Sequence, residues 1–233
     1  MSADDVLFHA GHRERLKAKL LDGKLTSYEK LELLLTFAIP RRDVRPLARS
    51  LIQKFRSVYF VFTAPIEELE RVPGVGRSTA ILIHLVHELM LVSYRERLAD
   101  GTVLADMTFI KEYCRQLLSG KQVEEFHVMY LGKNNRLLLD DTHSVGTLDY
   151  SAAHPREIAR KALSLNAISV ILVHNHPMSD NGFSRQDIEL TDTVAQHLRL
   201  ASATVLDHLL VSGNGIVTSY RESAWANKSL FGK

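Results

Sequence analysis

The sequence predicts an α+β protein, with an all-helical first half followed by a second half that forms an α/β sandwich. Apolar residues recur at helical spacing up to about residue 95, whereas strand-like patterns dominate after Gly120. The chain has 233 residues, enough for one large domain or two modest ones, and 45% of them are hydrophobic and 24% charged. This is the composition of an ordinary soluble globular protein, and it excludes collagen-like, disordered and low-complexity chains.

Four helices are predicted in the first half. Thr26 and Glu29 have the spacing of a capping box, and a leucine-rich run follows them until Pro40 ends it. The other three helices are expected at about 44–55, 66–71 and 77–95. The segment 95–107 has little apolar periodicity and is predicted to be a linker. We therefore expect a helical domain over residues 1–98.

The turn between the third and fourth helices carries the first motif. Its Val-Pro-Gly-Val-Gly sequence, at residues 72–76, resembles a helix-hairpin-helix. Gly74 and Gly76 lack a Cβ, so the backbone can turn sharply and approach a ligand closely. Free N–H groups at the start of the next helix, where Arg77 stands, can hold a phosphate. The motif therefore indicates contact with DNA, but such hairpins also occur as packing elements, and both interpretations stay open.

Positive charge is concentrated in the first half. Residues 1–100 carry 16 Lys and Arg against 13 Asp and Glu, whereas residues 101–233 carry 13 against 14. The basic side chains gather in two clusters: Arg13, Arg15, Lys17 and Lys19, and then Arg41, Arg42, Arg45 and Arg49. Such clusters can bind phosphate backbones, or they can simply form a solvated helix face.

The second half alternates strands and helices. Strands are predicted at about 125–131, 136–140, 167–176, 204–211 and 216–219. Helices are predicted at about 109–118, 154–165 and 185–200. The run before His176 is almost continuously apolar, which is typical of a strand buried on both faces of its sheet.

Two histidines at the end of this buried run and an aspartate after it have the pattern of a metal site. His174 and His176 stand at i and i+2 of a strand, so both rings project from one face. Asp187 falls in the first turn of the next helix and can supply a carboxylate oxygen. Two imidazoles and one carboxylate leave a fourth position open, which is the pattern of a catalytic rather than a structural zinc.

Simpler interpretations of the neighbouring residues stay open. Ser184 and Asp187 also have the spacing of a helix cap, and Asp187 could merely complement the helix dipole. His208, beside Asp207 in a late strand, either orients a metal ligand or packs within the sheet.

The segment His174-x-His176-x7-Ser184-x2-Asp187 matches the JAMM (MPN+) metalloprotease motif, and the chain as a whole resembles the RadC family. Further support comes from residues 11–16, 38–44, 154–157 and 206–208. The resemblance implies a JAMM/MPN-like domain of cytidine-deaminase-like α/β/α architecture, with a mixed sheet, over residues 103–225, and a tail at 226–233. It also implies one zinc ion per chain, held by His174, His176 and Asp187, with Ser184 steadying an oxyanion.

The resemblance further implies a glutamate that acts as general base. Glu125 fits best, the adjacent Glu124 is the second choice, and Glu157 is a third that more resembles a helix-start acid. One departure from the family concerns the loop beside the site. Where RadC proteins typically have a proline before the motif serine, this chain has Gly182 and Phe183, which leaves the rigidity of that loop and the fit of a substrate in doubt.

The sequence therefore predicts a zinc-dependent hydrolase that cleaves a peptide or isopeptide bond in an unidentified protein or peptide. The alternative is a DNA-binding protein associated with repair or recombination, whose metal domain is structural or regulatory. A single cysteine, Cys114, and the lack of a signal peptide or membrane span predict a cytoplasmic protein.

Overall fold

The computed structural model describes residues 3–40, 42–101, 107–146, 155–177, 179 and 182–223. Parts of the predicted linker, His154 and the predicted tail at 226–233 lie outside these residues. The chain divides into two compact units, Met1–Leu89 and Met90–Lys233, which are described separately below. Among the described helices, none combines the length and apolar character that crossing a membrane requires.

The first unit is entirely helical in its described part. It contains α1 (Ala3–Leu21), α2 (Ser27–Ala38), α3 (Arg45–Phe55), α4 (Val58–Thr63), α5 (Ile66–Glu70) and the first part of α6 (Arg77–Ala99). The predicted capping box begins α2, because the Thr26 hydroxyl accepts from the Glu29 amide at 3.2 Å and Glu29 accepts from the Thr26 amide at 2.9 Å.

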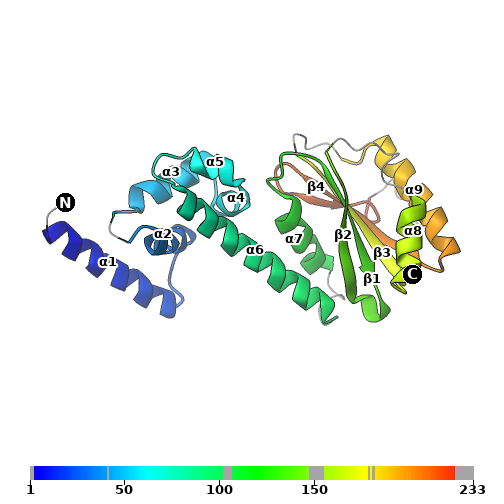
Figure 1. Ribbon diagram of the computed structural model, residues 1–233, viewed down its shortest axis with the longest axis horizontal. Helices are drawn as coiled ribbons and strands as arrows, with labels where there is room; N and C mark the ends of the chain where they lie inside the picture. The colour runs from blue at the N-terminus through cyan, green and yellow to red at the C-terminus, as the bar shows by residue number, and fades with distance from the viewer. Residues whose placement is uncertain are drawn as a thin grey trace. The chain divides into compact units, whose positions relative to one another are not determined.

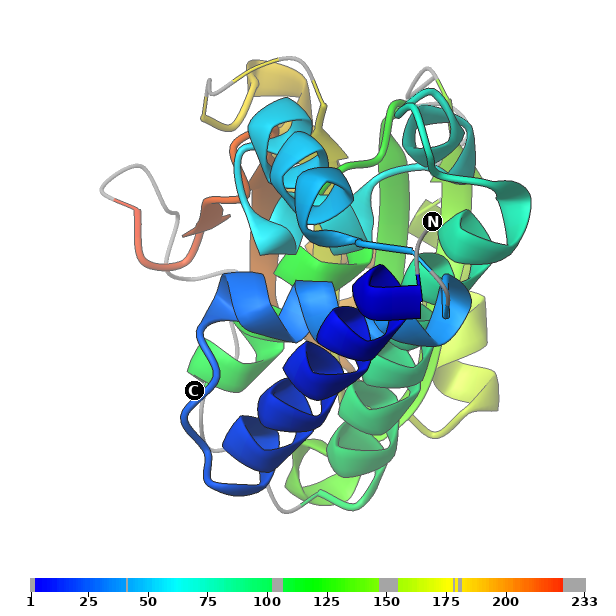
Figure 2. The same cartoon turned by 90° about the vertical axis from the view of Figure 1, so that its left-hand side faces the viewer.

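Two helices of this unit, α1 and α4, were not predicted. α1 packs against α2 (Figure 1, Figure 2) and buries Leu16 beside Leu25 and Leu33. Among its described side chains, α1 contributes Leu16 to the core. One such residue does not form the repeated apolar stripe that marks an amphipathic helix, so the sequence pattern did not predict α1. α4 has six residues, too few to display a helical period.

The long helix α6 belongs to both units, and this corrects the predicted linker. The helix continues to Ala99, and the boundary between the units falls near its middle rather than after it. Leu91 and Leu98 are buried against Ile110 and other residues of the second unit's core. The polar sequence after residue 95 therefore continues the helix, which buries only a narrow face there.

The second unit is a mixed five-stranded sheet between helices. Its further elements are α7 (Met107–Leu118), β1 (Glu125–Leu131), the 3-10 turn η1 (Lys133–Asn135), β2 (Leu137–Val145), α8 (Pro155–Ser164), β3 (Ser169–His176), α9 (Arg185–Leu200), β4 (Thr204–Ser212) and β5 (Val217–Ser219). The strand order is β2-β1-β3-β4-β5, with β3 and β4 parallel and the other neighbours antiparallel. This confirms the predicted mixed sheet.

The two faces of the sheet are covered by different helices (Figure 1). α8 and α9 lie over one face and α7 over the other. Phe126 and Val128 of β1 pack toward α8 and α9, whereas Met129 and Leu131 pack toward α7. Since successive side chains of a strand alternate between faces, this register decides which side each residue of β1 serves.

Candidate metal centre

The two histidines of the motif lie at the carboxyl end of β3, on the face covered by α8 and α9. His174 is fully buried, and the His176 side chain retains 14% exposure. Leu172, two residues before His174, packs into the core on the same face. The alternation of the buried strand therefore directs both imidazoles toward the start of α9.

Asp187 faces these rings from the first turn of α9. Ser184 caps the helix, because its hydroxyl accepts from the Asp187 amide at 3.1 Å and its own amide donates to Asp187 Oδ2 at 2.6 Å. This reciprocal capping box leaves Asp187 Oδ1 directed at His174 Nε2, 3.3 Å away. The capping interpretation and the ligand interpretation are thus both satisfied, since the cap orients the carboxylate.

The spacing of the three donor atoms fits a zinc ion. His174 Nε2 lies 3.2 Å from His176 Nε2, and the two Nε2 atoms lie 3.3 and 3.8 Å from the nearer oxygens of Asp187. Ligands about 2.05 Å from a tetrahedral zinc lie about 3.3 Å from one another. Among the described residues, this is the group of acidic, histidine and cysteine side chains whose donor atoms converge closely enough for a metal.

Asp187 is ionised, as a ligand must be. Burial alone would raise the pKa of this carboxyl. The His174 ring 3.3 Å from Oδ1 and the hydrogen bonds from Ser184 outweigh burial and hold the pKa of Asp187 below its ordinary range.

Glu125, the first choice for the general base, lies on the wrong face of the sheet. It begins β1 one residue before Phe126, so its carboxylate points toward the α7 side. There it accepts from Lys121 at 3.1 Å and lies 3.2 Å from His127 Nε2. Glu125 is therefore a member of a buried ionic network on the side away from the histidines, and its role as the base stays a prediction.

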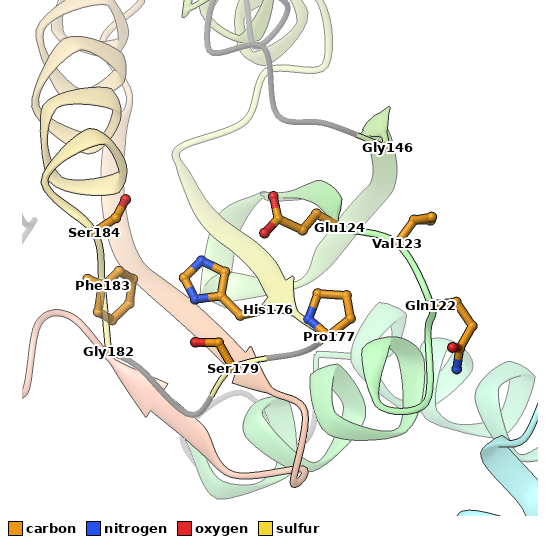
Figure 3. A pocket seen from close by; sticks show the side chains of 10 residues that line it. All are labelled: Gln122, Val123, Glu124, Gly146, His176, Pro177, Ser179, Gly182, Phe183 and Ser184. Atoms are coloured by element: carbon orange, nitrogen blue, oxygen red, sulfur yellow. The ribbon is translucent and has the colours of Figure 1, made fainter.

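Glu124 is on the correct face. Its carbonyl accepts from the Gly146 amide at 2.8 Å, which extends the β1–β2 ladder by one residue and continues the alternation back from Phe126. Its side chain extends into a cavity shared with His176 and Ser184 (Figure 3). Glu157, the third choice, pairs with Arg160 at 2.7 Å in the first turn of α8 and is not among the cavity's residues.

The cavity beside the histidines has a volume of about 710 Å³ and opens to solvent. Its lining comes from the segment before β1, the end of β2 and the loop between β3 and α9 (Figure 3): Gln122, Val123, Glu124, Gly146, His176, Pro177, Ser179, Gly182, Phe183 and Ser184. Phe183, where the resemblance leads us to expect proline, packs its ring 5.8 Å from that of His174 and 5.1 Å from that of His208. The ring of Phe183 therefore packs against His174, a proposed ligand.

A side chain between the two histidines supports the Glu124 segment. Asn175 points to the opposite face from its neighbours, where its Oδ1 accepts from the Glu125 amide at 2.8 Å. Its Nδ2 donates to the Val123 carbonyl at 3.1 Å. Both peptide groups that flank Glu124 are thereby held by the strand that carries the histidines. The sequence indicated nothing of this contact, because the partners are about fifty residues apart.

The hairpin of the first unit has the predicted form, with a short α5, a turn and the long α6. Gly74 has a φ of +95°, a conformation that favours glycine, whereas a Cβ at Gly76 would meet no atom within 4 Å. Arg77 begins α6, but its guanidinium lies 3.3 Å from the Glu70 carboxylate. The Arg77 side chain, which was predicted to contact a phosphate, therefore pairs with an acidic residue of α5.

At least half of the eight clustered basic side chains have partners inside the described part of the first unit. Arg13 donates to the Ile39 and Arg42 carbonyls at 3.2 and 3.1 Å. Lys17, Lys19 and Arg45 pair with Glu14, Glu29 and Asp43, each at 2.7 Å. Ion pairing therefore offsets the charge of three of these eight basic side chains.

Comparison with known proteins identifies the family of the second unit. A protein-family model described as a RadC-like JAB domain matches residues 104–225. The chain is also similar to a UPF0758 protein of Fusobacterium nucleatum, with 35% identity over 222 residues that cover 91% of this chain and 96% of that protein. The name of that relative specifies no reaction. The family match spans the elements that carry His174, His176 and Asp187.

Proposed function

Since the chain belongs to the RadC family, whose JAB domain forms its second unit, we propose that it is a zinc-dependent hydrolase of peptide or isopeptide bonds. One observation carries the proposal. The three donor atoms of His174, His176 and Asp187 have the mutual spacing of zinc ligands, and a glutamate on the same face lines the adjoining cavity. The cavity supplies the open side that a catalytic rather than a structural site requires.

The residues around the cavity have complementary roles in this proposal. When bound, zinc acts as a Lewis acid and lowers the pKa of a water molecule toward neutrality. Glu124 accepts the proton of the attacking water and later returns it to the leaving amine. The Ser184 oxygen accepts from the Asp187 amide, so its hydroxyl proton stays available to donate to a developing oxyanion.

The shape of the cavity supports a polypeptide substrate. The cavity is an open cleft rather than an enclosed chamber, and Val123, Pro177 and Phe183 give it apolar walls. An extended chain can enter such a cleft from solvent with an amide bond beside His176. The class of bond rests on the family resemblance, which supports amides of peptide or isopeptide type.

The first test is metal content. Wild type reconstituted with zinc should retain about one ion per chain after gel filtration, and His176→Ala and Asp187→Ala should lose it. His197→Ala is the matched control, because this histidine lies on α9 and contacts the Thr193 carbonyl instead of the site. Wild type that retains no zinc would overturn the proposal.

The second test is turnover. Wild type should cleave members of a panel of peptide and isopeptide substrates, and a chelator should stop cleavage until zinc is restored. Cleavage that persists after complete removal of metal would contradict a metal-dependent reaction.

A further inference from the structure

A closed set of hydrogen bonds joins two of the proposed ligands through two residues that have no ligand role. His174 Nδ1 lies 2.9 Å from His208 Nε2, and His208 Nδ1 lies 2.7 Å from the Thr191 hydroxyl. Thr191 in turn donates to the Asp187 carbonyl at 2.6 Å. All four side chains are at most 1% exposed, so water does not compete for these contacts.

The direction of each hydrogen bond follows from the last one. A carbonyl oxygen can only accept, so the Thr191 hydroxyl proton goes to Asp187. Thr191 therefore has only lone pairs to offer His208, whose Nδ1 must carry a proton and donate it. The His208 ring is 0% exposed and its nitrogens contact Thr191 and His174, neither of them a carboxylate, so a second ring proton would be an uncompensated buried charge and the ring is neutral. Its Nε2 is consequently an acceptor.

These assignments determine which ring nitrogen of His174 carries the proton. Because His208 Nε2 accepts, His174 Nδ1 must carry the proton and donate it. The Nε2 of a neutral His174 then has a free lone pair, and this is the atom that lies near His176 Nε2 and Asp187 Oδ1. The opposite tautomer would place a proton at the metal position.

We propose that His208 and Thr191 are positioning residues that hold His174 in the tautomer competent to bind zinc. The inference rests on the proposed zinc site and adds to it two residues outside the ligand motif. Thr191 lies one helical turn after Asp187 on α9, and His208 lies on β4 opposite Leu172 of β3. The packing of α9 over β3 and β4 therefore assembles the set, and the Phe183 ring packs against both imidazoles.

The tautomer itself can be measured without metal or substrate. Long-range ¹H–¹⁵N spectra of the histidine rings distinguish Nδ1–H from Nε2–H in the zinc-free protein. In wild type we expect His174 to be protonated at Nδ1. In Thr191→Val, which keeps the shape and removes the hydroxyl, we expect loss of this single tautomer, whereas Thr191→Ser should preserve it. A wild-type His174 protonated at Nε2 would overturn the inference.

Zinc affinity provides a second readout. In competition with a chelator, Thr191→Val and His208→Leu should bind zinc about 10- to 100-fold more weakly than wild type. Thr191→Ser should stay close to wild type, and His208→Gln, whose amide offers an acceptor and a donor, should recover part of the loss. If wild type binds zinc and Thr191→Val binds it equally well, the inference is wrong. If wild type binds none, the proposed function fails, while the His174 tautomer still decides this inference.

Discussion

At the scale of single residues, two adjacent glutamates have different surroundings because a strand alternates its faces. Glu124 faces the cavity with His176, and Glu125 faces α7. Glu125 is one end of a buried chain of partners that continues through His127 to Asp140, which also accepts from the Tyr113 hydroxyl. Their roles are therefore expected to separate cleanly on substitution.

Glu124→Gln should lower turnover by about 10²- to 10⁴-fold while zinc content stays unchanged, because the amide cannot accept a proton from water. Glu125→Gln is the matched control on the opposite face, and it should change turnover by less than about tenfold. Steady-state kinetics on any substrate that wild type cleaves, with metal analysis of each variant, makes the comparison. The reverse ranking of the two variants would assign the base to Glu125 instead.

The network around Glu125 also predicts how stability depends on pH. Burial alone would lower the pKa of His127, but its hydrogen bond to Asp140 and the charges of Asp140 and Glu125 outweigh burial and raise it. A raised pKa in the folded state means that protonated His127 stabilises the fold below its unfolded value of about 6.5. This contribution is lost as the pH rises through the folded pKa.

The difference in free energy of unfolding between wild type and His127→Gln, from urea titrations, should therefore fall from about pH 6 toward alkaline pH. His127→Gln should be less stable than wild type at the acidic end, and this deficit should shrink as the pH rises. Equal slopes for the two proteins would mean that His127 titrates alike in the folded and unfolded states.

At the scale of secondary-structure elements, the site depends on turns that hold the end of β3. The turn between β4 and β5 approaches the chain just after His176 so closely that a Cβ on Gly213 would lie 2.4 Å from the Pro177 carbonyl oxygen. On the other side of β3, Asn175 ties the strand to the segment that carries Glu124. The position of the ligands is thus set by backbone contacts from two neighbouring segments.

Gly213→Ala should force these two backbones apart, and we expect it to destabilise the protein by about 1–3 kcal/mol and to weaken zinc binding. Gly182→Ala is the control, because Gly182 lines the cavity beside the histidines and a Cβ there meets no atom within 4 Å. Thermal unfolding and chelator competition would measure both effects. A Gly213→Ala protein as stable as Gly182→Ala would show that the turn can shift without destabilising the protein.

At the scale of the whole molecule, the hairpin and the metal centre belong to different compact units. The hairpin turn contains Gly74 with a φ of +95°, and α5 beside it carries Glu67, Glu68 and Glu70. The metal centre is assembled entirely from the second unit. The two halves should therefore respond independently to substitution.

Arg77→Glu should leave zinc content and turnover at wild-type values and should reduce whatever affinity the chain has for duplex DNA. Binding of labelled duplex at several salt concentrations measures the second effect, since phosphate contacts weaken steeply as salt rises. Arg160→Glu, on α8 of the second unit, is the charge-matched control. Loss of zinc from Arg77→Glu would show that the halves are coupled.

The sequence by itself determined the features that depend on local pattern. Helical and strand periods predicted most elements of both units, the capping box at Thr26 and the buried character of β3. The spacing of His174, His176 and Asp187 was also sufficient to predict that these three side chains converge, because strand alternation and the first turn of a helix are local geometry.

Only the tertiary structure decided what depends on contacts between distant segments. That Glu124 rather than Glu125 lies beside the cavity required the register of β1 against β3, in which Phe126 lies opposite His174. The contact of His208 with His174 required β4 to lie parallel beside β3, and the continuation of α6 beyond residue 95 required the second unit's core to bury Leu98. These facts are fixed by packing across the sheet, whereas a residue's period and spacing along the chain report only its nearest neighbours.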